Sequence, residues 1–184
     1  MAEINNRNKN AKKLILSSYL SLLDKDRNAS ITVKDICKNT IINRGTFYLH
    51  YSSMEDFLVS LEENCYEVIE KVMNEIYAMA NFTSRPLFDM IEDNPDLFKY
   101  FVFYSRGTAK VKWVNNLMTN IREKSYKWKD ISDEQLDLMV NFLIGGAITY
   151  LIHFINHGLQ NKQYLIESMD AIVTKGTRGL NQLI

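Results

Sequence analysis

The sequence predicts an all-α protein of about nine helices, in which a three-helix N-terminal domain precedes a larger helical domain. Apolar residues recur every three or four positions along most of the 184 residues, which is the period of an amphipathic helix. The chain contains only 2 Pro and 7 Gly, so it offers few of the turns that connect β-strands. Hydrophobic residues make up 46% of the sequence, which is enough to build a core and argues against a disordered chain.

The first predicted helix spans about residues 8–23, after a short polar segment that we expect to be frayed. Leu14, Ile15 and Tyr19 lie at helical spacing along it. The helix begins within a basic cluster, which comprises Arg7, Lys9, Lys12 and Lys13. Such a cluster is ordinarily a solvated helix start, but beside a DNA-binding helix it becomes a candidate arm for phosphate contacts.

Two short helices follow, joined by a tight turn. Thr32 and Asp35 have the spacing of a capping box, in which each side chain accepts a hydrogen bond from the backbone N–H of the other residue. Asn43 is a suitable N-cap for a second short helix over residues 44–51. Two short helices in this order are typical of a helix-turn-helix unit, whose second helix can enter the major groove of DNA.

The rest of the chain is predicted to form further helices, separated by polar, glycine or proline-containing breaks. Ser53 with Asp56 is a second capping box at the start of a long helix, and Pro95 suits the first turn of a later one. The predicted helices span about residues 53–80, 87–92, 96–105, 109–128, 132–158 and 162–180. We therefore expect a helix-turn-helix domain over residues 1–52 and a second domain over residues 53–184.

Residues 43–51 (NRGTFYLHY), followed by EDFL at 55–58, resemble the signature of the tetracycline-repressor (TetR) family of transcriptional regulators. The resemblance covers roughly the first third of the chain. It implies a homodimer that binds a palindromic operator and more often represses than activates. It also implies an effector site in the second domain, occupied by a small molecule or, as an alternative, by a protein coactivator. By this resemblance, Thr46, Tyr48 and His50 would contact DNA.

The residue types in the second short helix suit a DNA contact. A mid-helix glycine costs roughly 1 kcal/mol relative to alanine, so Gly45 indicates a close approach by another group. Thr46 and Tyr48 can donate to phosphates, Arg44 can bind a guanine edge, and Phe47 is expected to pack inward. The predicted DNA-binding residues are Thr32, Asn43, Arg44, Gly45, Thr46, Tyr48, His50 and Tyr51. A helical corner that binds no DNA is the alternative.

Two positions depart from the family pattern. Ile41 stands in the turn where glycine is common, and a β-branched residue resists positive φ, so we expect the turn to differ. Residues 52–54 are Ser-Ser-Met where a lysine is frequent. We expect hydroxyl and backbone N–H groups to contact phosphate there, which makes binding less dependent on salt.

The charge is distributed unevenly, although the net charge of the chain is zero. Residues 1–50 contain nine Lys or Arg and four Asp or Glu, a balance of +5, and the remainder has a balance of −5. A basic N-terminal segment on an acidic body is consistent with a DNA-binding head.

The second domain is expected to bind the effector and to form the dimer. Aromatic residues gather over 98–104, where polar-tipped rings suit a ligand cavity or, alternatively, an ordinary core. The residues expected to line the effector site are Tyr66, Met73, Tyr104 and Phe142. Palindromic operators require two recognition helices roughly 34 Å apart. The residues expected at the dimer interface are Ile144, Ile148, Leu151, Ile155, Leu165, Met169 and Ile172.

No catalytic motif is present, and we expect neither an enzyme nor a cofactor. His153 and His157 share a helix face but lack the glutamate of HExxH, so a metal site is not expected. Cys37 and Cys65 do not form a disulfide framework, and the N-terminus has no signal-peptide pattern, which favours the cytoplasm. The apolar run 138–155 approaches the length of a membrane span. A helical interaction protein or membrane-tethered adaptor that binds no DNA is therefore the alternative.

Overall fold

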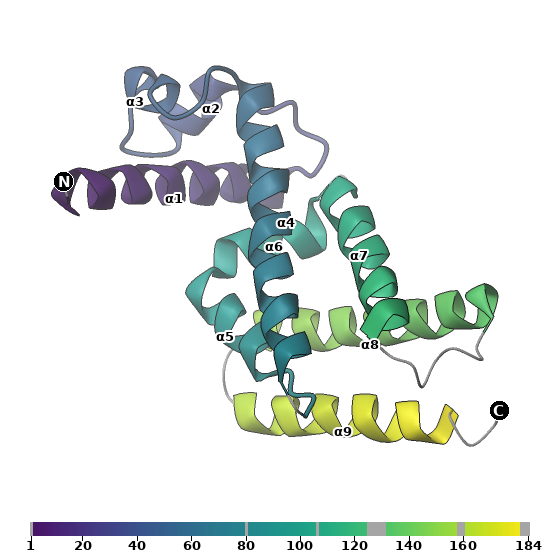
Figure 1. The fold of residues 1–184 in the computed structure, drawn as a ribbon. Coiled ribbons are helices and arrows are strands. Elements are labelled where there is room, and N and C mark those ends of the chain that lie inside the picture. The colour runs from purple at the N-terminus through teal and green to yellow at the C-terminus, as the bar shows by residue number, and fades with distance from the viewer. Residues whose placement is uncertain (1, 80, 106, 125–131, 158–160, 181–184) are drawn as a thin grey trace. The chain divides into compact units, whose positions relative to one another are not determined.

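The computed structural model describes residues 2–79, 81–105, 107–124, 132–157 and 161–180 (Figure 1). Within these ranges it contains nine α-helices and no strand, which confirms the predicted all-α fold. The helices are α1 (Ala2–Lys25), α2 (Val33–Lys38), α3 (Arg44–Tyr48), α4 (Met54–Ala78), α5 (Arg85–Asp93), α6 (Pro95–Phe103), α7 (Thr108–Lys124), α8 (Asp133–His157) and α9 (Lys162–Leu180).

The helix ends agree closely with the capping residues, with two exceptions. The first helix begins at Ala2 instead of about residue 8, because the polar N-terminal residues contain no helix breaker. The helix α3 ends at Tyr48 instead of Tyr51. The N–H groups of His50 and Tyr51 both donate to the Phe47 carbonyl, each at 3.0 Å, so the chain continues as a hydrogen-bonded turn.

The helices form two compact units. Unit 1 comprises Met1–Cys65 and Asp96–Tyr104, and unit 2 comprises Tyr66–Pro95 and Ser105–Ile184. Unit 1 therefore extends beyond residue 52, where the sequence alone placed the domain boundary. It includes the first half of α4 and nearly all of α6.

Aromatic rings form the core of unit 1. Phe57 on α4 lies edge-on to Tyr19 of α1, with ring centroids 5.3 Å apart, and also contacts Phe47 of α3 at 6.1 Å. Tyr100 of α6 is 2% exposed and donates to Glu62 Oε1 at 2.6 Å. The Cys65 thiol donates to the Leu97 carbonyl at 3.8 Å, and burial raises the pKa of this thiol. These contacts explain why α6 belongs to unit 1.

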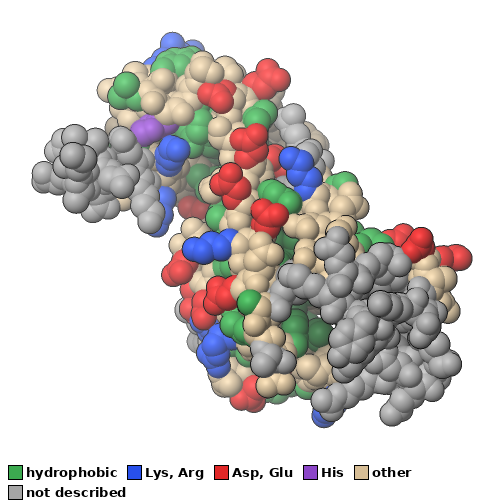
Figure 2. All heavy atoms as spheres, viewed as in Figure 1, with side chains coloured by type: hydrophobic (Ala, Val, Ile, Leu, Met, Phe, Trp, Pro, Cys, Tyr) green, Lys and Arg blue, Asp and Glu red, His purple; other side chains and the backbone are tan. Residues whose placement is uncertain are grey.

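The helix α4 has an apolar side and an acidic side. Its buried residues recur at helical spacing and are Phe57, Leu61, Cys65, Ile69, Val72 and Ile76. The exposed side carries Glu63 and Glu67, and Figure 2 shows Asp and Glu side chains along it. Because α4 contributes its first half to unit 1 and its second half to unit 2, it is a helix that both units share.

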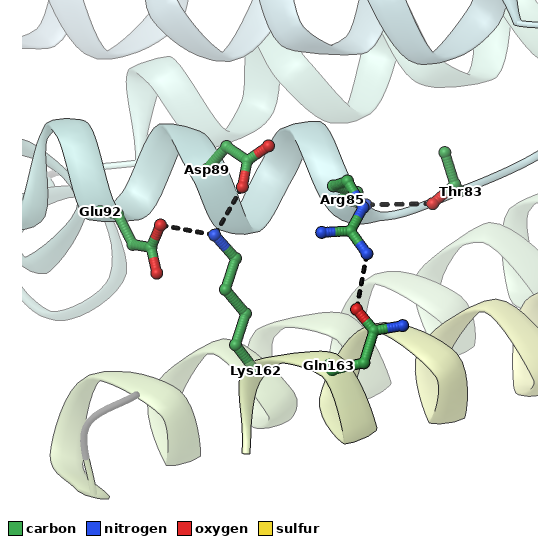
Figure 3. A network of polar contacts seen from close by, with 6 residues as sticks. All are labelled: Thr83, Arg85, Asp89, Glu92, Lys162 and Gln163. Atoms are coloured by element: carbon green, nitrogen blue, oxygen red, sulfur yellow. Dashed lines mark hydrogen bonds and ion pairs between the residues drawn. The ribbon is translucent and has the colours of Figure 1, made fainter. Parts of the chain in front are cut away.

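Unit 2 is held by an apolar core and by polar contacts between α5 and α9. Phe88 and Phe154 pack edge-to-face with centroids 5.1 Å apart. Lys162 at the start of α9 donates to Asp89 and Glu92 of α5, each at 2.5 Å (Figure 3). The same figure shows Arg85 donating to Gln163. A buried serine and a carboxylate, Ser84 and Asp170, are bonded through the serine N–H and hydroxyl at 2.6 and 2.7 Å.

One helix within the described residues, α8, is long and apolar enough to cross a membrane by length and composition. A core helix of a soluble protein passes the same test.

Candidate nucleic-acid interface

The helix α2 is fixed at its N-terminus and along its buried side. Asp35 N donates to Thr32 Oγ1 at 3.3 Å, and Thr32 N donates to Asp35 Oδ2 at 3.1 Å, so the predicted capping box is present. Hydrogen bonds to the Asp35 carboxylate from the Thr32 hydroxyl and from the Thr32 N–H lower the pKa of the Asp35 carboxyl. Ile36 is fully buried, and Ser18 of α1 donates to its carbonyl at 3.0 Å. These contacts hold α2 against α1 with Ile36 facing the core.

The turn between α2 and α3 forms without a left-handed residue. Ile41 is 91% exposed, and no non-glycine residue in the described part of the chain has positive φ. A turn that relies on glycine is therefore not used here. The turn leaves the Ile41 side chain in solvent beside the first residues of α3.

The N-terminus of α3 is capped by Asn43 as the sequence predicts. Its Oδ1 accepts from Thr46 N at 2.8 Å and from the Thr46 hydroxyl at 3.2 Å. Because a hydroxyl has one proton, Thr46 can donate to a phosphate only if it leaves Asn43. A Cβ at Gly45 would lie 3.2 Å from the same Oδ1, so the cap itself gives a reason for glycine at that position.

The two faces of α3 differ sharply. Phe47 is fully buried, as expected, and packs against Tyr51 with ring centroids 5.6 Å apart. The other face is exposed and consists of Arg44, Gly45, Tyr48 and Leu49. Arg44 and Tyr48, and likewise Gly45 and Leu49, are four residues apart, so the four residues lie on one side of the helix. We call these four residues the α3 face. Figure 2 shows hydrophobic side chains among polar ones on the surface over α2 and α3.

Tyr51 is buried, unlike most of the other residues predicted to contact DNA. It is 9% exposed and its ring packs 5.1 Å from that of Phe57, so Tyr51 is a core residue, and burial raises the pKa of its hydroxyl. The motif places Tyr51 beside His50 without indicating which side chain points inward, so its contact with DNA stays a prediction that this burial disfavours. His50 is half-buried, whereas Tyr48 is 54% exposed. Leu49, which was not predicted as a contact, is 83% exposed. Its position four residues after Gly45 could have indicated this.

The segment that contains α3 is basic, and α1 carries exposed lysines. Between residues 36 and 51 the chain carries Lys38 and Arg44 and no Asp or Glu. Lys12 and Lys13 of α1 are exposed, and Lys12 Nζ lies 5.7 Å from the Tyr51 ring centroid. The side chains of Arg7 and Lys9, predicted to belong to the same basic arm, lie outside the described residues.

The start of α4 differs from the expected phosphate contact. Ser53 Oγ accepts from Asp56 N at 3.0 Å, but the Asp56 carboxylate accepts from the N–H and hydroxyl of Ser52, at 2.6 and 2.9 Å. The donors of Ser52 are therefore already used within the chain. We expect little phosphate contact from Ser52.

The four residues predicted for the effector site are not all in one unit. Tyr66 and Met73 lie two turns apart on α4 in unit 2, where Tyr66 donates to Glu70 at 2.9 Å. Phe142 on α8 is 79% exposed. Tyr104 belongs to unit 1, where its hydroxyl donates to Asp24.

Most of the residues predicted for the dimer interface lie on the buried sides of α8 and α9. Four of the seven residues are less than 10% exposed, because they pack in the core of unit 2; these are Ile144, Leu151, Leu165 and Met169. Ile148 packs against the same core, Ile155 is half-buried, and Ile172 is 50% exposed. An all-round apolar helix gives no sequence signal for its buried side.

The opposite side of α8 is exposed and partly apolar. Its exposed residues recur at helical spacing and include Leu138, Asn141, Phe142, Gly145, Gly146, Thr149 and His153. We call this the open face of α8. A Cβ at either glycine would meet nothing within 4 Å among the residues that the structure describes. Two glycines in a helix interior are costly, and the missing side chains allow a second helix to approach closely.

His153 and His157 are both exposed on α8, with ring centroids 4.5 Å apart. No group of three or more His, Cys, Asp or Glu side chains within the described residues is arranged to hold a metal ion. Both cysteines are free thiols.

Comparison of the chain with protein-family models and with curated proteins finds no match. The function proposed below therefore rests on the residues and contacts of this chain.

Proposed function

We propose that the protein is a DNA-binding transcriptional regulator, more often a repressor, whose homodimer binds a palindromic operator through α3. The observation that carries this proposal is the two-sided structure of α3. Phe47 fixes one side in the core of unit 1, while the α3 face presents a guanidinium, a phenol and an apolar side chain to solvent. These groups can bind guanine edges, phosphates and thymine methyls.

The electrostatics of the N-terminal segment support the same role. The balance of +5 over residues 1–50 attracts the phosphate backbone, while the −5 of the remainder directs that attraction to one end of the sequence. The exposed Lys12 and Lys13 are the described members of the basic arm. Because Lys12 lies near the Tyr51 ring, the arm and the end of the recognition helix can reach one DNA segment together.

The open face of α8 supports a homodimer. An exposed phenylalanine with two adjacent glycines allows a second helix to approach closely and bury the ring. A second copy of the chain offers the same face, and a two-fold axis would then match the symmetry of a palindrome. Ile144 and Leu151, which were predicted to lie at the dimer interface, are buried on the other side of α8 and would hold the open face in position.

Control by an effector would act through α4. A ligand bound beside the second half of α4 displaces that half, and the first half carries the helix-turn-helix with it. The ligand releases DNA only if it binds more tightly to the protein conformation that fits the operator poorly. Small molecules and a protein coactivator are both compatible with this mechanism.

Selection of binding sites from a pool of random DNA duplexes tests the proposal. We expect enrichment of a palindrome whose two half-sites are centred about 10 base pairs, one helical turn, or a multiple apart. A control selection with Arg44→Ala protein should give weaker enrichment and lose a guanine from each half-site. A pool that shows no enrichment with the wild-type protein contradicts the proposal.

A helical interaction protein or membrane-tethered adaptor is the second candidate, and α8 is the observation that favours it. Its length and apolar composition suit a membrane span, and its open face is exposed. The two candidates differ in solution. A regulator remains soluble without detergent and sediments as a dimer, whereas a tethered protein partitions into lipid vesicles.

A further inference from the structure

The Leu49 side chain is little buried by the rest of the chain. The residue is 83% exposed and has ordinary right-handed helical backbone angles at the C-cap of α3. A leucine in solvent at this position contributes little to folding, because the apolar area that it removes from water is small. The adjacent core is complete without it, since Phe47 is fully buried.

Gly45 makes the surface next to Leu49 accessible. The two residues are four apart, so they lie on the same side of α3, one turn from each other. A helical side chain leans toward the preceding turn, which places Leu49 over the position where Gly45 has no side chain. The α3 face therefore contains an apolar surface formed by Leu49, next to the space left by the missing side chain of Gly45. Tyr48 is exposed beside it.

The major groove exposes one apolar group that such a surface could contact. Among the base edges exposed there, the C5-methyl of thymine alone is apolar, and the remaining groups are hydrogen-bond donors and acceptors. The charge near α3 favours DNA as the occupant, because residues 36–51 include Lys38 and Arg44 and no acidic residue.

We propose that Leu49 reads a thymine methyl group in each operator half-site, with Gly45 leaving the space that the methyl enters. This proposal rests on the proposed function and names part of the sequence that the protein recognises. Arg44, on the same face, would select a guanine at a neighbouring position.

Removal of single methyl groups from DNA tests the proposal directly. A duplex recovered by the selection described above is resynthesised with deoxyuridine in place of one thymidine at a time, symmetrically in both half-sites. Deoxyuridine keeps every hydrogen-bonding group and lacks only the methyl. We expect one position per half-site at which the substitution weakens wild-type binding about fourfold per methyl, or about 15-fold for the pair.

The same duplexes are then titrated with three variants. With Leu49→Ala, the deoxyuridine substitution at that position should change affinity less than about twofold, because the contact is already absent. Leu49→Met, which keeps an apolar side chain, should restore part of the sensitivity. Val59→Ala, which truncates another exposed apolar residue of unit 1, should behave as wild type. Thermal melting of each variant checks folding.

The outcomes are distinct. A loss of affinity on replacing thymidine by deoxyuridine that is present in the wild type and absent in Leu49→Ala supports the proposal. A methyl effect that is equal in wild type and Leu49→Ala, or no methyl effect at any position, overturns it while leaving specific DNA binding intact. Absence of any enriched duplex overturns the proposed function and this inference together.

Discussion

Substitution of Phe142 by serine should separate the proposed dimer into folded monomers. The ring is 79% exposed on the open face of α8, so its removal does not disturb the core of unit 2. A phenylalanine side chain has about 200 Å² of surface, so about 160 Å² is available for burial by a partner. If half of that area is buried, the ring contributes about 2 kcal/mol per protomer at about 25 cal/mol per Å².

Two copies of the ring per dimer then contribute about 4 kcal/mol, which corresponds to about a thousandfold in the dissociation constant. Sedimentation equilibrium over a range of concentrations measures this constant. Val111→Ser on α7 is the matched control, because Val111 is also an exposed apolar residue of unit 2, at 59%. A change of less than about threefold for Phe142→Ser, with Val111→Ser as reference, would show that the open face of α8 is not the dimer interface.

Two further predictions concern unit 1. Asn43→Ala should destabilise the protein by about 1 kcal/mol in chemical denaturation, because α3 loses its N-cap, whereas Asn74→Ala at an exposed mid-helix position should be neutral or stabilising. Asp24 gives a pH dependence: burial works to raise the pKa of its carboxyl, but hydrogen bonds from Lys99 and Tyr104 hold it below the ordinary 3.8. A lowered folded-state pKa contributes stability above pH 3.8 that is lost as pH falls through the folded value. The difference in unfolding free energy between wild type and Asp24→Asn should be at most about 1 kcal/mol near neutral pH and shrink below pH 4; an unchanged difference would contradict the assignment.

Local signals in the sequence were sufficient for most helix boundaries. Capping residues act within one turn, so Thr32 and Asn43 indicated the starts of α2 and α3 without knowledge of the fold. Pro95 indicated the start of α6 in the same way, since proline is favoured at the first helical position.

Contacts between distant residues could not be predicted from such signals. The Tyr104–Asp24 and Tyr100–Glu62 hydrogen bonds join residues 80 and 38 positions apart, and they place α6 in unit 1. Nothing near residue 100 in the sequence indicates these partners. The extent of unit 1 beyond residue 52 is a consequence of them.

The sequence also did not indicate which side of α3 or of α8 is exposed. The motif over residues 43–51 indicated a short helix there but not its exposed side, so the predicted contacts include the buried Tyr51 and omit the exposed Leu49. On α8, apolar residues surround the helix, and periodicity alone could not distinguish Ile144, which is buried, from Phe142, which is exposed. Only tertiary packing decides these orientations.

The most direct test of the central claim compares Tyr48→Ala with Tyr164→Ala in a DNA titration at fixed salt. Both tyrosines are exposed, at 54% and 67%, but only Tyr48 lies on α3. With the selected palindrome as probe, Tyr48→Ala should lose about 1–3 kcal/mol of binding free energy, roughly a 5- to 150-fold weaker affinity, and Tyr164→Ala should bind as wild type. Equal affinity of the wild-type and Tyr48→Ala proteins would contradict the assignment of α3 as the helix that contacts DNA.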